Sequence, residues 1–330
     1  MLQAINTHQQ LVDAKYAKPG QYTCPICHRP VVLKKGSVKM PHFAHQSIKD
    51  CFIYTYKKET AAHIEGKYAL YDLFHPKTCF MEYYLPEIEQ IPDCFHASGI
   101  AFELQMSVIP TSHIAARSRG YASIGIDVIW IAKFEAIKLD GKRMKLTHFQ
   151  NALIHLKGNV LVTYHTQLKT FFVLHITRVI NRYTYEVNLE CIQSGEALLK
   201  AISLSQLDMR YRVLSQHETK QHIQNCLAKK SVLEPTLSGL YQLGIDRRKI
   251  PCDLRIVLPS QLYIASHPIE WQVQLMHMIQ NKRFEFNQWM AILNLSKQSQ
   301  MVMPPELLAF EILKEYQQIS NQMRAIITEK

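Results

Sequence analysis

Residues 91–107 read IPDCFHASGIAFELQMS, and this stretch decides how the fold is interpreted. From Ile100 to Met106 the side chains alternate between the two faces of a predicted β-strand. One face carries large apolar side chains, whereas the other carries Glu103 and Gln105. A buried carboxylate in so apolar a strand is costly unless a salt bridge or a metal ion compensates its charge.

A second carboxylate, Asp93, lies shortly before this strand. The residues from His96 to Gly99 predict a turn, so two antiparallel strands would bring Asp93 and Glu103 together. Two like charges at short distance repel each other unless a divalent cation lies between them. Mg²⁺ binds a pair of carboxylates, keeps positions for water and phosphate oxygens, and can polarise a scissile phosphate. The pair therefore indicates either phosphodiester hydrolysis or a polar sheet edge without chemistry.

The segments around this pair alternate between helical and strand periodicity. Helical spacing of apolar residues predicts one helix before the strands, and a second helix that begins with proline and threonine follows them. The expected order is helix, three strands, helix and strand, at residues 59–74, 79–85, 88–95, 99–107, 110–122 and 126–134. This order predicts an α/β unit around one small mixed sheet.

The flanking segments differ from this unit in character. Residues 1–23 contain one or two predicted strands, and residues 24–58 look loop-like and basic. Residues 159–177 predict a pair of strands, and beyond about residue 200 the pattern is mostly helical. We therefore expect three domains, which comprise residues 1–58, 59–200 and 201–330.

The positive charge of the chain is concentrated at one end. The 330 residues carry a formal net charge of +11. The first 58 residues hold nine lysines and arginines against two acids, a net charge of +7. Such a concentration favours nucleic acid as a partner. No apolar run reaches 18 residues and the start lacks a signal peptide, so we expect a cytoplasmic protein that does not contact membrane.

Residues 24–45 read CPICHRPVVLKKGSVKMPHFAH and contain two pairs of metal-ligand side chains, each pair separated by two residues. This spacing matches a tetrahedral zinc site. A segment this short and polar builds little core, so structural Zn²⁺ would supply its folding energy. Cys51 and His28 are close enough in sequence to replace one of the histidines. The expected ligands are Cys24, Cys27, His42 and His45.

Basic residues stand between the two ligand pairs, namely Lys34, Lys35 and Lys39. On a hairpin stiffened by zinc they would be suited to phosphate contacts. The chain has eight cysteines in all, and in a cytoplasmic protein we expect them to be thiols or metal ligands rather than disulfides.

Four motifs in order resemble the CoiA competence-protein family: CPIC…PHFAH (24–45), AHIEGKYALYDLF (62–74), PD…GIAFELQMS (92–107) and RSRGYASIGIDVIWI (117–131). GIDRRKIP and EWQVQLMHMIQ, farther along, are similar to the helical C-terminal region of that family. The element order, with P-D before E-x-Q, also resembles the PD-(D/E)xK nuclease core. This resemblance implies a restriction-endonuclease-like α/β fold (αβββαβ), with a zinc-finger-like module before it and a mainly helical region after it.

The resemblance implies roles for several residues at matching positions. Asp93 and Glu103 would bind catalytic Mg²⁺ or Mn²⁺, and Gln105 stands where many nucleases of this fold hold lysine. A glutamine can orient water or phosphate, but it has no charge with which to stabilise a transition state. His63 and Lys67 lie four residues apart on one face of the first helix, where they would hold a water or a phosphate beside the metal.

Arg117 and Tyr121 form another pair four residues apart, on the second helix. Both are candidate DNA-binding residues, and packing against the sheet is the alternative, which is favoured for Tyr121. Trp130 is expected in the core.

The resemblance implies a competence protein that acts in natural transformation and processes DNA for recombination as a Mg²⁺-dependent DNA nuclease. Its partners would be DNA, single-stranded or in recombination intermediates, and recombination proteins. The alternative is a nuclease-derived factor that binds DNA and recombination proteins with little or no catalysis. Asp93, Glu103 and Gln105 together favour the nuclease, whereas glutamine in place of lysine favours the binding factor.

Overall fold

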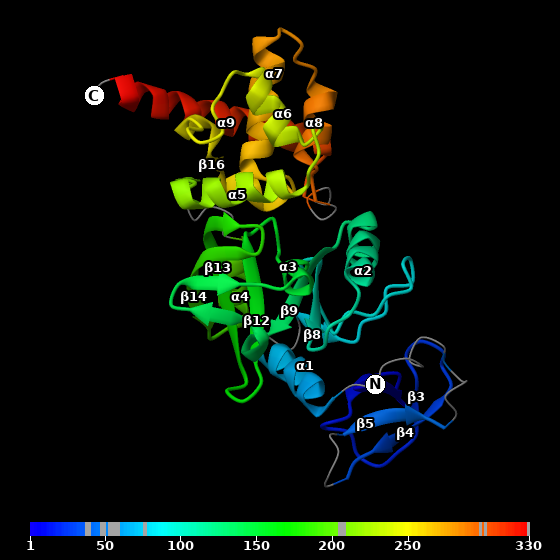
Figure 1. Cartoon of the computed structure of the whole chain (residues 1–330). Helices are drawn as coiled ribbons and strands as arrows, with labels where there is room; N and C mark the ends of the chain where they lie inside the picture. Colours follow the sequence, from blue (N-terminus) through cyan, green and yellow to red (C-terminus); the bar gives the residue numbers. More distant parts are fainter. Residues whose placement is uncertain are drawn as a thin grey trace. The chain divides into compact units, whose positions relative to one another are not determined.

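The computed structural model of this chain describes residues 1–36, 41–46, 51, 60–74, 78–203, 209–296, 299 and 302–328. Figure 1 traces the chain from the blue N-terminal strands, through the green strands of a large sheet, to the yellow and red helices of the C-terminal region. The architecture is mixed α/β, as the sequence predicts.

The N-terminal segment forms a five-stranded antiparallel sheet in the order β2-β1-β3-β4-β5. A small core that includes Ala4, Val31 and Phe43 packs within this module. The sequence pattern predicted one or two strands before Cys24, whereas the structure has three there. The strands are β1 (Gln3–Asn6), β2 (Leu11–Asp13), β3 (Tyr22–Thr23), β4 (Pro30–Lys34) and β5 (His42–His45).

A nine-stranded sheet follows, in the order β10-β11-β14-β13-β12-β9-β8-β7-β6. Strand β9 pairs in parallel with both β8 and β12, whereas β6, β7 and β8 pair antiparallel. The strands are β6 (Cys79–Met81), β7 (Cys94–His96), β8 (Ile100–Gln105), β9 (Asp127–Lys133), β10 (Lys138–Asp140), β11 (Arg143–Lys145), β12 (Val160–His165), β13 (Thr170–Asn181) and β14 (Thr184–Ile192).

Two helices flank the strands that carry the candidate carboxylates. Helix α1 (Ala61–Leu73) begins after Thr60, whose hydroxyl accepts a hydrogen bond from the His63 N–H. Helix α2 (Thr111–Ser123) connects the parallel strands β8 and β9, as a parallel pair requires. The local order is therefore α1, β6, β7, β8, α2, β9.

Strand β6 ends earlier than the periodicity suggested. The sequence predicted a strand over 79–85, whereas β6 ends at Met81. The next residue, Glu82, has a φ of 49°, in the left-handed region that takes a chain out of a strand. Glu82 is nevertheless buried, so this turn holds its carboxylate inside the protein.

The C-terminal region is mainly helical, as the sequence predicts. Its aromatic core centres on Trp271, Trp289 and Tyr316. None of the helices in the described part of the chain is both long and apolar enough to cross a membrane. The C-terminal helices are α5 (Gln216–Ala228), α6 (Pro235–Gln242), α7 (Pro268–Gln280), α8 (Phe286–Leu293) and α9 (Pro305–Thr328), with strands β15 (Arg212–Val213) and β16 (Ile256–Val257) and short 3₁₀ turns at Cys252–Leu254 and Pro259–Tyr263. Earlier in the chain lie α3 (His148–Asn151), α4 (Gly195–Ser203) and a 3₁₀ turn at Phe134–Ala136.

The contacts divide the chain into two compact units. Unit 1 comprises 1–138, 147–174 and 189–204, and unit 2 comprises 139–146, 175–188 and 205–330. The N-terminal sheet, α1, α2 and strands β6 to β9 all belong to unit 1. The division into three domains at residues 58 and 200 stays a prediction.

Candidate functional site

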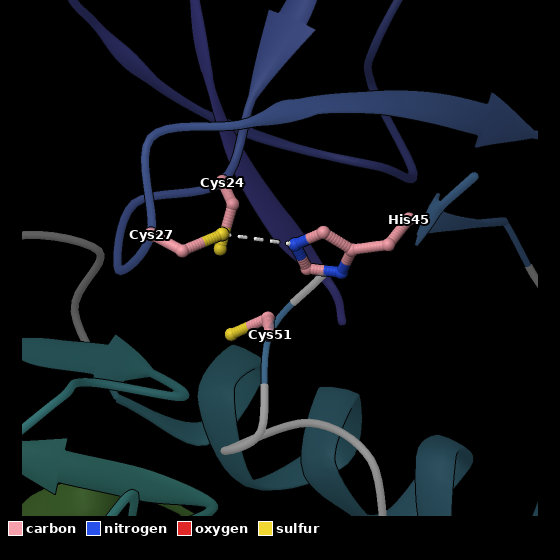
Figure 2. A group of neighbouring side chains, drawn as sticks. All are labelled: Cys24, Cys27, His45 and Cys51. Atoms are coloured by element: carbon pink, nitrogen blue, oxygen red, sulfur yellow. Dashed lines mark hydrogen bonds between the residues drawn. The ribbon is translucent and has the colours of Figure 1, made fainter. Parts of the chain in front are cut away.

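Three cysteines and one histidine gather in the N-terminal module. The ligand atoms of Cys24, Cys27, His45 and Cys51 all lie within 4.8 Å of one another, and Cys27 Sγ is 3.2 Å from His45 Nε2. Figure 2 shows the four side chains grouped beside the loop that carries the first two cysteines. Soft thiolates with one imidazole are a donor set for tetrahedral zinc, so this cluster can hold such a metal.

The loop between β3 and β4 is built to present the first two cysteines. The His28 N–H donates to the Cys24 carbonyl at 3.0 Å, and the Ile26 N–H points to Cys24 Sγ at 3.4 Å. His28 adopts a φ of 56°, which closes this tight turn. Burial raises the pKa of the Cys24 thiol to about 12. A metal ion would oppose this effect, because a bound metal favours the thiolate.

The fourth position of the cluster is taken by Cys51, the alternative ligand, and His42 is not among its members. The reason is strand geometry. His42 and His45 are the first and last residues of β5, and three steps along a strand place two side chains on opposite faces. One strand therefore cannot direct both imidazoles to the same metal. His28 is likewise outside the group, and its backbone N–H closes the turn onto the Cys24 carbonyl.

The predicted phosphate-contacting lysines are partly described. Lys34 and Lys35 are exposed at the end of β4, and the Lys35 ammonium donates to the backbone carbonyl of Lys15 at 3.2 Å. Lys39 lies outside the described residues. Lys34 pairs with His42 across β4 and β5, so both lysines belong to the module that holds the cysteine cluster.

Three carboxylates line up across neighbouring strands of the large sheet. Met81 pairs with Cys94, and Cys94 pairs with Phe102. The next residues on these strands, Glu82, Asp93 and Glu103, therefore stand at one level, and all three are buried. The Glu82 N–H donates to the Asp93 carbonyl at 3.2 Å, which continues the ladder to this level. The sequence predicted Asp93 and Glu103 but missed Glu82.

Asp93 joins helix α1 to strand β8. Its Oδ2 accepts a hydrogen bond from the Leu104 N–H at 2.9 Å, and His63 Nε2 lies 3.1 Å from the same oxygen. His63 Nε2 is also 2.9 Å from the Leu104 carbonyl. Both neighbours are oxygen acceptors, so this nitrogen carries the proton. Lys67 Nζ lies 3.1 Å from Asp93 Oδ1, so one helix face brings both predicted residues to one carboxylate.

Lys67 is wholly buried rather than solvated. Its ammonium lies between Asp93 and Glu82, and the distance to Glu82 Oε1 is 2.9 Å. The other oxygen of Glu82 accepts a hydrogen bond from the Leu2 backbone N–H at 2.7 Å. Burial alone would raise the pKa of Glu82, but nearby positive charges, above all Lys67, and the Leu2 N–H lower it to about 2.

Glu103 is bound from the other helix. Arg117 and Tyr121, one turn apart on α2, both donate to Glu103 Oε1. Tyr121 is fully buried, so packing, the favoured alternative, describes its position. The Arg117 side chain is 28% exposed and also donates to the Ile91 carbonyl at 3.2 Å. Although burial works in the opposite direction, the Glu103 carboxylate raises the pKa of Arg117 above its usual range.

Trp130 is buried on the strand beside Glu103, as predicted. Its ring lies 5.7 Å from the Arg117 guanidinium, and its N–H donates to Ser118 Oγ at 2.9 Å. The ring therefore supports Arg117 in its position against Glu103.

Gln105 turns away from this cluster of charges. Its amide donates to the Ser107 carbonyl at 2.6 Å, and its side chain is partly exposed. The structure therefore brings Asp93, Glu103, His63, Lys67 and Arg117 together with Glu82 but leaves Gln105 at the rim.

The cost of burying the two predicted acids is offset by side-chain cations. Asp93 lies against Lys67, and Glu103 against Arg117. Their oxygens are hard donors of the kind that Mg²⁺ prefers, so the donor chemistry fits that ion. Among the residues that the structure describes, however, only the cysteine–histidine group brings three or more acidic, histidine or cysteine donors within mutual reach. Asp93 and Glu103 would therefore need water or phosphate oxygens to complete a magnesium shell.

Comparison with known proteins covers the N-terminal module and the large sheet. Residues 4–54 match the family model for the N-terminal domain of competence protein CoiA, and residues 59–207 match the model for its nuclease-like domain. Competence protein CoiA of Bacillus subtilis (strain 168) is 32% identical over 126 residues, which are 37% of this chain. The chain thus matches about a third (34%) of that relative's length.

No solved structure matches the chain. The family matches nevertheless extend through both the cysteine cluster and the sheet that holds Asp93 and Glu103. This chain belongs to the CoiA competence-protein family.

Proposed function

We propose that this protein acts in natural transformation, where its nuclease-like domain is a Mg²⁺-dependent DNA nuclease of the PD-(D/E)xK type. The observation that carries the proposal is the position of Lys67. Its ammonium lies 3.1 Å from Asp93, although the place usually held by lysine on the neighbouring strand is occupied by Gln105. Lys67 from helix α1 thus supplies the positive charge that Gln105 lacks.

In this proposal Asp93 and Glu103 would hold the metal, which would polarise the scissile phosphate and lower the pKa of a bound water. His63 donates from Nε2 and so holds the Asp93 carboxylate in place. Arg117, partly exposed beside Glu103, is the residue able to reach a DNA phosphate. The basic module with Lys34 and Lys35 contributes further phosphate contacts.

The test is cleavage of labelled single- and double-stranded DNA with Mg²⁺ or Mn²⁺. Cleavage should disappear in Glu103→Ala and Asp93→Asn, with DNA binding by fluorescence anisotropy retained. Asp140→Asn, which changes an exposed acid on β10, serves as the matched control and should cut like the wild type. Cleavage that persists in Glu103→Ala would rule out this site.

A second function, DNA and recombination-protein binding without catalysis, is favoured by a different observation. Both acids already have side-chain cations as partners, and Gln105 is bound to the Ser107 carbonyl. In that case the nuclease-like domain is a binding scaffold. Wild-type protein that binds DNA in a salt-dependent manner, yet does not cut DNA with any divalent metal that is added, would establish this alternative.

A further inference from the structure

We propose that the metal-binding module is a structural part of the carboxylate site. In this proposal Leu2 fixes Glu82, and Glu82 is the positioning residue that holds Lys67 against Asp93. The inference rests on the proposed function only for its effect on catalysis, because the connection itself can be tested without any cleavage.

The connection begins at the cysteine cluster. His45, a member of that cluster, lies on β5 together with Phe43. The Phe43 N–H donates to the Met1 carbonyl at 2.8 Å, so the strand that carries the ligand also holds the segment that leads into β1. A metal that fixes His45 therefore also fixes the backbone of Met1.

Leu2 then links the module to the large sheet. Its carbonyl accepts from the Ala14 N–H at 2.8 Å, and its own N–H donates to Glu82 at 2.7 Å. The Leu2 side chain is 1% exposed and packs in the core formed by α1 and the large sheet, rather than in the core of its own module. Tyr68 of α1 donates in turn to Asp13 of β2 at 2.9 Å, a second contact of the same kind.

Both the backbone and the side chain of Glu82 are fixed by hydrogen bonds and an ion pair. Its backbone occupies the left-handed region, its N–H is bonded to the Asp93 carbonyl, and its two oxygens take separate partners, Leu2 and Lys67. A buried carboxylate with a strained backbone and a separate partner on each oxygen is typical of a positioning role. Without Glu82, the Lys67 ammonium would lose a carboxylate partner and would draw Asp93 away from its place beside Leu104.

The test compares Leu2→Pro with Leu2→Ala in the full-length protein. Proline removes the N–H whose hydrogen bond Glu82 accepts, whereas alanine keeps it, and both replace the buried leucine side chain with a smaller one. The first readout is hydrogen exchange of the Leu104 amide, resolved by fragmentation mass spectrometry, because that amide donates to Asp93. We expect exchange about tenfold faster in Leu2→Pro than in Leu2→Ala, and a comparable acceleration in Cys27→Ser, which disrupts the metal site.

The second readout is Mn²⁺-dependent DNA cleavage by Glu82→Gln, which keeps the side-chain shape and removes the charge. We expect kcat to fall about tenfold with KM for DNA within about twofold of the wild type, since Glu82 touches neither DNA nor metal. Equal Leu104 exchange in Leu2→Pro and Leu2→Ala would overturn the connection even if the enzyme cuts DNA. Faster exchange in Leu2→Pro with a wild type that never cuts would support the connection and reject the nuclease function.

Discussion

The stability that Glu82 gives to unit 1 should depend on pH in a predictable way. The pKa of this carboxyl group falls from an ordinary 4.5 to about 2 in the folded protein, and only 8% of the residue is exposed. This difference corresponds to about 3 kcal/mol of folding free energy. A lowered carboxyl pKa stabilises the fold above pH 4.5, and the stabilisation is lost as the pH falls towards 2.

Glu82→Gln should therefore be less stable than the wild type by about 3 kcal/mol at pH 6, and the difference should shrink to roughly half at pH 3. Urea unfolding followed by Trp130 fluorescence measures this difference, in a Trp271→Phe/Trp289→Phe background that leaves one tryptophan in the chain. Glu65→Gln, which removes an acid of α1 from a more exposed ion pair with Lys169, is the control and should lower the stability by less than about 1 kcal/mol at pH 6. If the difference in unfolding free energy between the wild type and Glu82→Gln stayed constant between pH 6 and pH 3, this would falsify the lowered pKa of Glu82.

Three further predictions concern other parts of the molecule. Cys51→Ser should lower bound zinc, measured by elemental mass spectrometry, whereas His42→Ala should retain about one equivalent. Gly158→Ala should destabilise unit 1 by about 1–3 kcal/mol in urea unfolding, because the new Cβ would lie 2.3 Å from the Ile202 carbonyl oxygen. Burial lowers the pKa of His222 to about 4, so unit 2 should lose stability as the pH falls from 6.5 to 4, and thermal scans of His222→Gln should show a smaller loss.

Each of these predictions has a matched control. Gly36→Ala places its Cβ in open space and should leave stability unchanged within about 0.5 kcal/mol. His217→Gln changes an exposed histidine of the same helix and should keep the full acid-induced loss. Full zinc content in Cys51→Ser, or a His222→Gln protein that loses as much stability in acid as the wild type, would contradict the corresponding prediction.

Periodicity predicted the elements around Asp93 because their apolar residues repeat with the spacing of the secondary structure. Helices α1 and α2 and strands β8 and β9 lie where the pattern placed them. The end of β6 could not be predicted, because it depends on the left-handed backbone of Glu82, and β7 begins at Cys94 rather than at residue 88. The polar stretch after β9 likewise gave no indication that 138–145 would form the hairpin β10–β11.

The candidate site was predictable only in part for a similar reason. Asp93 and Glu103 lie close in sequence, so a short turn is enough to connect them. Glu82 is brought to them by the register between β6 and β7. Leu2 contacts Glu82 although the two residues are 80 positions apart in the sequence. Spacing also could not decide between His42 and Cys51, since that choice depends on which of the two histidines of β5 lies on the face towards the cysteines.

The interleaving of the two units has a practical consequence for anyone who trims the chain. The six segments alternate between the units, so the backbone passes from one to the other five times, twice within the long hairpin of β13 and β14. A recombinant fragment that stops near residue 204 would keep the 175–188 portion of that hairpin but lose the residues that complete its unit. Expression of the chain before or after residue 204 alone should therefore yield an insoluble or protease-sensitive product. Labels or tags are better placed at exposed turns than near residue 204.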